Sequence, residues 1–142
     1  MQWAFHAHRC ARRSYNSQAT ATCPLLTEED LAQLRFHVGS MDLAIESGLI
    51  TKYDDIQREF HNAYTRRCGN ARLITLIEQM ERYFIKRDYG AVEQTTAQEL
   101  LRKANAEHRR ILELFEAKDA EGVRSYVRDT HWNIENAPFT VW

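Results

Sequence analysis

The stretch that decides the fold runs from Thr27 to Ile45 and reads TEEDLAQLRFHVGSMDLAI. It opens with a capping box, because the hydroxyl of Thr27 is followed three residues later by the carboxylate of Asp30. Apolar residues then recur at helical spacing, at Leu31, Leu34, Val38, Met41 and Ile45. This stretch predicts an amphipathic helix that ends at Gly48.

The same period continues towards the C-terminus. It predicts further helices over about 52–67, 70–88 and 96–117, and a last one between Asp119 and Pro138. Gly69 supplies a left-handed helix end and Asn70 the next helix start. The chain holds only five Gly and two Pro, too few for the many turns of a sandwich or barrel. We therefore expect an all-α fold, an antiparallel bundle of five to six helices.

The residues before Thr27 differ in composition. They contain Arg9, Arg12 and Arg13 but no acidic residue, which is the composition of a transit peptide or of an N-terminal arm. A short periodicity supports a helix near 3–14, and 16–24 resembles a linker. We expect an arm or linker over 1–26, partly helical, a helical domain over 27–138 and a short tail over 139–142.

Composition limits the function classes. The 142 residues include 19 basic and 20 acidic ones, for a net charge of -1. Proteins that bind nucleic acid over their surface usually carry a basic excess, so direct DNA binding is not expected. No apolar run reaches the roughly 18 residues of a membrane span. Three scattered cysteines without a CxxC pair indicate reduced thiols and a cytoplasmic protein.

Three histidines lie among the apolar positions of three predicted helices, namely His61, His108 and His131. Each buried imidazole needs a partner for its polar nitrogens, and a shared Zn, Ni, Cu or Fe ion would satisfy one nitrogen of each ring. The pattern alone leaves open three separately hydrogen-bonded core histidines. Arg82 and Arg102 are candidates for holding a carboxylate if either leans into the same cavity.

Several motifs occur in the order of a known family. Residues 56–61 (IQREFH) precede 68–73 (CGNARL), and 107–111 (EHRRI) precede 117–121 (AKDAE); TEEDL opens the series at 27–31. This arrangement resembles the FadR-type C-terminal (FCD) domain of GntR-family bacterial transcription regulators. The resemblance covers about Thr27 to Asn136.

The resemblance implies an all-helical effector domain that binds a metal through one Asp and three His, senses a small organic acid and dimerises. His61 and His108 match two of the family's ligands. Gln57 stands where the family has its Asp, and Thr130 stands in the slot of the last His, one residue before His131. One residue is a rotation of about 100° on a helix, so His131 needs a small rotation to reach the site. The implied metal is Zn or Ni.

We therefore expect an effector-binding and dimerisation domain without enzymatic activity, which senses a small carboxylate and forms a homodimer. Residues 1–26 are too few for the family's DNA-reading winged helix, so the chain alone is not expected to bind DNA. Two alternatives stay open at this point. One is a metal-dependent hydrolase-like enzyme, because a three-histidine metal can activate water. The other is a metal-free structural dimerisation module.

Overall fold

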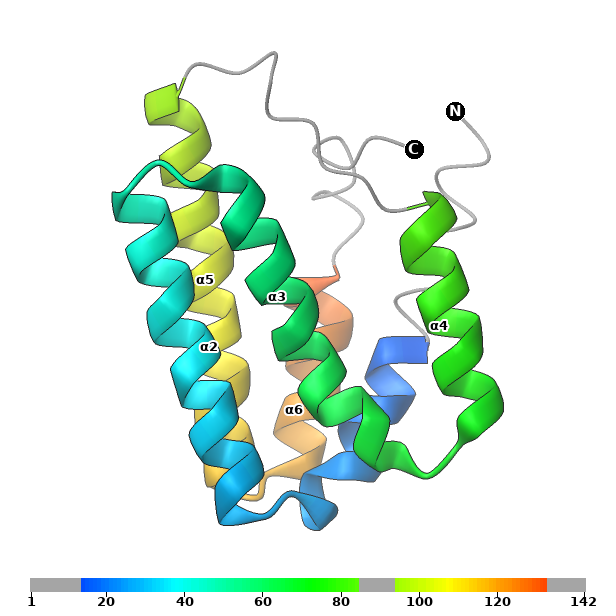
Figure 1. The fold of residues 1–142 in the computed structure, drawn as a ribbon. Coiled ribbons are helices and arrows are strands. Elements are labelled where there is room, and N and C mark those ends of the chain that lie inside the picture. The colour runs from blue at the N-terminus through cyan, green and yellow to red at the C-terminus, as the bar shows by residue number, and fades with distance from the viewer. Residues whose placement is uncertain (1–13, 85–93, 133–142) are drawn as a thin grey trace.

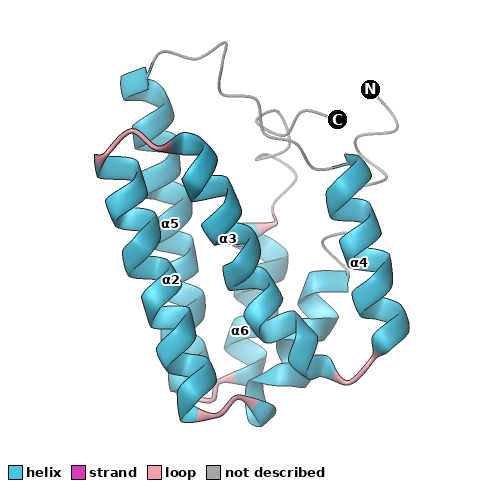
Figure 2. Ribbon diagram, in the orientation of Figure 1, coloured by secondary structure: helices cyan, strands magenta, loops and turns pink. Residues whose placement is uncertain are grey.

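The computed structural model describes residues 14–84 and 94–132, apart from the side chains of 80–84 and 94–95. All regular elements within these ranges are helices, and no strand occurs there (Figure 2). A helix over residues 14–22 is followed by η1 (Cys23–Leu25), α2 (Glu28–Glu46), α3 (Ile50–Thr65), η2 (Arg66–Cys68), α4 (Ala71–Phe84), α5 (Gln94–Glu116), α6 (Ala120–Tyr126) and η3 (Val127–His131). The all-α prediction is confirmed.

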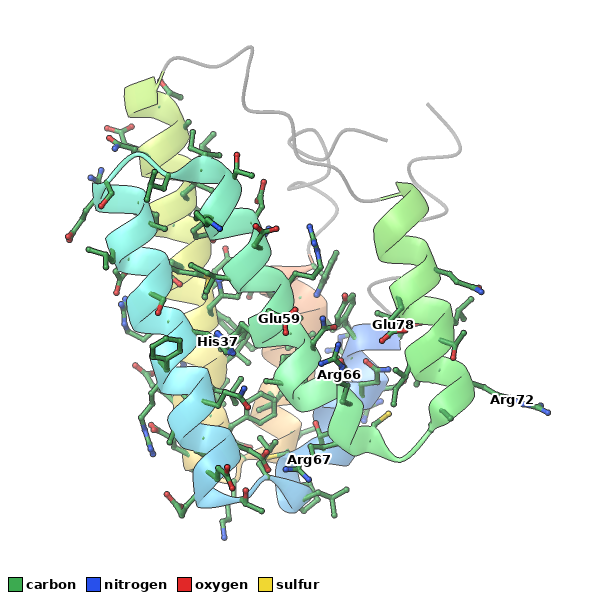
Figure 3. The ribbon with its side chains drawn as sticks, in the orientation of Figure 1. His37, Glu59, Arg66, Arg67, Arg72 and Glu78 are labelled. Atoms are coloured by element: carbon green, nitrogen blue, oxygen red, sulfur yellow. The ribbon has the colours of Figure 1, made fainter. Side chains whose placement is uncertain are left out.

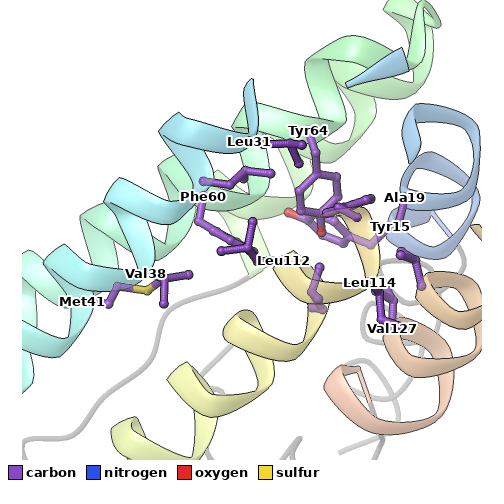
Figure 4. Packing of buried hydrophobic residues seen from close by; sticks show 14 of the residues in the cluster. Tyr15, Ala19, Leu31, Val38, Met41, Phe60, Tyr64, Leu112, Leu114 and Val127 are labelled. Atoms are coloured by element: carbon purple, nitrogen blue, oxygen red, sulfur yellow. The ribbon is translucent and has the colours of Figure 1, made fainter. Parts of the chain in front are cut away.

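Three long helices form the body of the fold. Figure 1 shows α2 and α3 side by side, with α5 behind them and α6 with η3 behind α3, next to α5. The apolar face predicted for α2 is buried, with Leu34 and Met41 at 0% exposure. Both belong to one core with Phe60 of α3 and Leu112 of α5, and Figure 4 shows Met41 on the same side of α2 as this core. Helical periodicity thus identified the inward faces of all three helices.

The predicted capping box of α2 is present and is tied to the end of α3. Asp30 Oδ2 accepts from the Thr27 backbone N–H at 2.9 Å, and Thr27 Oγ1 accepts from the Asp30 N–H at 3.2 Å. Arg67 donates to Asp30 Oδ1 from Nε and Nη2, at 3.0 and 2.7 Å, and Figure 3 shows it at the foot of α3 beside the start of α2. Burial acts to raise the pKa of Asp30, but the hydrogen bonds from Thr27 and Arg67 outweigh it, so this pKa is lowered.

The predicted break before α4 is also confirmed. Gly69 has a φ of 68°, the left-handed conformation that glycine adopts without strain. Asn70 Oδ1 accepts from the Leu73 N–H at 3.0 Å and so caps α4. The helical spacing of Leu73, Leu76 and Ile77 predicts that all three point inward, but Leu76 is 48% exposed, whereas Ile77 is buried. The described part of α4 therefore buries a narrower stripe than its sequence suggested.

The linker expected over 16–24 is wrong. Residues 14–22 are helical, and Tyr15, Gln18, Ala19 and Thr22 are almost completely buried. The stretch is rich in Ser, Thr and Ala, which is typical of a polar linker, although its few larger side chains share one face. The helix expected near 3–14 lies outside the described residues except for its last position, as does the tail over 139–142.

None of the described helices combines the length and apolar character needed to cross a bilayer.

Candidate metal centre

Three buried histidines from three elements meet at one point. His61 lies on α3, His108 on α5 and His131 on η3, and one ring nitrogen of each lies within 4.8 Å of the others. Nε2 of His61 is 3.3 Å from Nε2 of His108 and 3.2 Å from Nε2 of His131. In the part of the chain that the structure describes, no other group of three or more His, Cys, Asp or Glu side chains lies close enough to share an ion.

Helical periodicity explains two of these positions. His61 is 6% exposed and follows Phe60, which is completely buried. His108 is also completely buried, three residues before Ile111 on the inward face of α5. The Phe60 ring lies 5.0 Å from the His108 ring and 5.6 Å from the His61 ring, between centroids. The core therefore holds both imidazoles at the junction of α3 and α5.

A π-helical turn over Val127–His131 explains the third. In a π turn a backbone N–H donates to the carbonyl five residues back, which takes up one more residue than an α turn. The Trp132 N–H donates to the Val127 carbonyl at 3.0 Å in this way. His131 is 9% exposed and turned inward, whereas Thr130 is exposed. The wider turn places His131, and not Thr130, on the side that faces His61.

Two of the imidazole rings form a hydrogen bond through their Nδ1 atom, the nitrogen that is not directed at the cluster. His61 Nδ1 lies 2.8 Å from the Tyr64 hydroxyl, and His131 Nδ1 lies 3.0 Å from Glu107 Oε2. A carboxylate only accepts, so Glu107 fixes the tautomer in which His131 carries its proton on Nδ1. When the ring is neutral with this tautomer, its Nε2 atom carries the lone pair and lies 3.2 Å from His61 Nε2. This orientation by an outer hydrogen bond is typical of metal-binding histidines.

The nitrogen spacings fit a metal ion. Two nitrogens that each lie about 2.0–2.1 Å from a tetrahedral zinc ion are about 3.3 Å apart. The two Nε2 separations of 3.3 and 3.2 Å agree with this value. Neutral imidazole is a ligand for zinc and nickel. The donor set is therefore suited to a divalent transition metal.

Aromatic rings enclose the cluster on the side of the N-terminal helix. Tyr15 stacks on Trp132, with ring centroids 4.6 Å apart and an interplanar angle of 13°. Tyr15 also approaches the His61 ring edge-on at 5.3 Å. Trp132 lies 5.9 Å from the His131 ring, between centroids. These rings exclude water from one side of the cluster and connect it to residues 14–22.

The other predicted site residues, Gln57, Arg102 and Arg82, are placed differently from the three histidines. Gln57 lies one turn before His61 on α3, and its Nε2 donates to Asp54 Oδ1 at 3.0 Å. Arg102 is exposed on α5, whereas His108 of the same helix is buried. The side chain of Arg82 lies outside the described part of α4.

Glu107 is the site residue that sequence reasoning missed. Helical spacing alone predicts that Glu107 lies on the polar side of α5. Its side chain is only 13% exposed because it turns towards His131. Its hydrogen-bond partner is 24 residues away on another element. No local spacing signals such a contact.

A model of a protein family, described as the FCD domain, matches residues 16–130. The match includes His61 and His108 and stops one residue before His131. No curated protein and no solved structure matches the chain.

Proposed function

The chain belongs to the FCD domain family, the effector domain of GntR-type transcription regulators, and from that premise we propose that it senses a small carboxylate at a metal held by His61, His108 and His131. The convergence of three Nε2 atoms at one buried point carries the proposal. The metal is a divalent transition ion, zinc or nickel. The protein acts as a non-enzymatic, cytoplasmic homodimer.

The chemistry of the cluster supports metal binding over three separate core histidines. Histidines that serve only packing are satisfied by partners around each ring. Here, instead, three rings direct Nε2 towards one another, and Glu107 fixes His131 in the tautomer whose Nε2 lone pair points inward. A hydrogen bond between two rings at these distances uses one N–H and one lone pair, whereas a cation between the three rings accepts a lone pair from each of them.

The proposed ligand class follows from the donor count. Three neutral imidazoles leave the full double charge of the ion uncompensated, and they leave at least one coordination position free. An anionic oxygen ligand satisfies both needs. The metal supplies that electrostatic attraction when bound, while Tyr64 and Glu107 hold the His61 and His131 rings in place.

The first test measures zinc binding by competition with a chromophoric chelator. The wild type is expected to bind one ion per chain, and His108→Ala is expected to bind at least a hundredfold more weakly. His37→Ala is the matched control, because His37 is a half-buried histidine of α2 outside the cluster (Figure 3). Glu107→Gln keeps all three ligands and is expected to weaken binding by about 10- to 100-fold.

The second test measures thermal stability with small mono-, di- and tricarboxylates, with and without zinc. A carboxylate that binds through the metal raises the melting temperature of the zinc-loaded protein and not that of the metal-free protein. Equal zinc affinity in the wild type and His108→Ala contradicts the metal site. Zinc binding without any carboxylate-dependent shift contradicts the proposed ligand class.

A further inference from the structure

The outer face of α2 carries apolar side chains that nothing in the described residues covers. Phe36 is 70% exposed and Leu43 is 63% exposed, two turns apart on the same face. Ala32 extends this face towards the start of the helix. Between them lies Gly39, where an added side-chain carbon would meet no atom within 4 Å. Exposed apolar residues that share one face mark an interaction surface more often than scattered ones do.

Opposite charges flank this outer face on the side of α5. Arg35 precedes Phe36 and pairs with Glu116, and Asp42 precedes Leu43 and pairs with Arg109. The side chains of Arg35 and Asp42 are 48% and 43% exposed. On this side of α2, Arg35 thus places a positive charge near one end of the outer face, and Asp42 places a negative charge near the other end.

The face is complementary to itself. Phe36 and Leu43 are seven residues apart and lie on either side of Gly39. In an antiparallel pair of α2 helices related by a two-fold axis near Gly39, Phe36 meets the partner's Leu43, and the reverse contact forms at the other end. The same operation places both α5 helices on one side of the pair. Arg35 then faces the partner's Asp42.

We propose that the outer face of α2 (Ala32, Phe36, Gly39 and Leu43) is the homodimer interface, occupied by α2 of a second copy in antiparallel orientation. Gly39 at the centre allows the two backbones to approach closely. The charges favour this orientation, because the antiparallel two-fold places the Arg35 and Asp42 flanks of both copies on the same side of the pair, whereas a parallel two-fold places them on opposite sides, where they do not meet. A second copy is favoured over an unrelated protein because apolar and charged positions alike obey the two-fold symmetry.

The first experiment measures the dimer dissociation constant by sedimentation equilibrium. The wild type is expected to be a dimer at micromolar concentration, and Phe36→Glu is expected to raise the dissociation constant at least a hundredfold. Leu76→Glu is the matched control, because it places the same charge on an exposed leucine of α4. It is expected to leave the constant unchanged. Far-ultraviolet circular dichroism checks that each variant keeps its helices.

The second experiment tests the antiparallel register by mixing charge variants. Arg35→Glu alone and Asp42→Arg alone each set like charges against each other twice across the dimer and weaken it. Mixed together they restore two attractive pairs, so the heterodimer is expected to be at least tenfold tighter than either homodimer. Each variant loses the same internal ion pair in both states, so the comparison isolates the contact between copies.

This inference rests on the proposed function only for the homodimer, and the experiments separate the two. A wild-type dimer that Phe36→Glu leaves intact overturns the interface but keeps the dimer. A monomeric wild type overturns both the interface and the dimer part of the proposed function. Failure of the mixed charge variants to associate overturns the antiparallel arrangement. Zinc affinity of Phe36→Glu remains at the wild-type value in every case, because the α2 face lies outside the histidine cluster.

Discussion

At the residue scale, Gln57 is the site at which this chain departs in chemistry from the ligand set implied by its family. An amide offers a metal a dipole, whereas a carboxylate offers a full charge in a region of low dielectric. Gln57→Asp is expected to tighten zinc binding by about tenfold, or about 1.4 kcal/mol. Desolvation of the new carboxylate in the metal-free protein limits the gain. Chelator competition measures the change.

Gln57→Asn is the control for Gln57→Asp, because it shortens the side chain without adding charge. Asp54, which now accepts from Gln57, adds a second negative charge beside the new carboxylate. Both charges favour the loaded state. Equal zinc affinity in the wild type and Gln57→Asp contradicts a place for position 57 in the site.

Asp30 is expected to contribute to stability through its two roles, as part of the α2 capping box and as the partner of Arg67. Asp30→Ala is expected to lower the free energy of unfolding by about 1–2 kcal/mol at pH 7. Urea denaturation measures this difference. Asp55→Ala, which removes an exposed carboxylate of α3 with only a long contact to Arg58, is expected to have a much smaller effect.

The Asp30 effect depends on pH in a defined direction. Because the pKa of Asp30 is lowered in the folded state, its stabilisation is complete above the unfolded-state pKa of about 3.9. It is lost as the pH falls through the lower, folded-state pKa. The difference between wild type and Asp30→Ala is therefore expected to shrink below about pH 4. A constant difference down to pH 2 contradicts the ionic role of this carboxylate.

At the scale of elements, the π turn of η3 is expected to be what allows His131 to reach the cluster. Deleting Thr130 removes one residue, so an ordinary α-helix then carries the histidine to the same place. We expect this deletion to keep zinc affinity within about threefold of the wild type. Inserting an alanine after Thr130 turns the histidine by a further 100° or so and is expected to abolish binding. A deletion variant that binds as poorly as the insertion variant contradicts this role.

The elements also show what the sequence could predict. Periodicity and capping residues located α2 through α5 and the break at Gly69, because these signals are local along the chain. The helix over residues 14–22 was missed, because its small and polar residues hide a stripe formed by Tyr15 and Ala19. Glu107 was missed for a different reason, since the contact that turns it inward is made by a residue on another element.

At the scale of the whole molecule, the N-terminal helix and the histidine cluster form one packed unit. Tyr15 is 1% exposed and contacts both Trp132 and His61. Tyr15→Ala is expected to destabilise the fold by about 3–5 kcal/mol, as for other large aromatic truncations in cores. Calorimetric melting measures it. Ser17→Ala, on the exposed side of the same helix, is the control and is expected to change stability by less than about 0.5 kcal/mol.

The Tyr15 variant also probes the link between stability and binding. The rise in melting temperature that zinc produces is expected to be smaller in Tyr15→Ala than in the wild type. The reason is that the variant disrupts the rings that exclude water from the cluster. The shift in melting temperature on adding zinc compares the two proteins directly. A wild-type melting temperature in Tyr15→Ala contradicts the assignment of this helix to the core.

The π turn also has a consequence for how ligand residues are matched between related sequences. One residue gained within a helix moves a ligand to the next column of any alignment, so that the ligand is scored as lost and an unrelated neighbour such as Thr130 as its replacement. In the folded chain His131 faces the cluster, because the π turn takes up one more residue than an α turn. A helical ligand is therefore better traced by the direction of its side chain in the folded chain than by its position in an alignment. A change that an alignment scores as the loss of a ligand can leave the site intact.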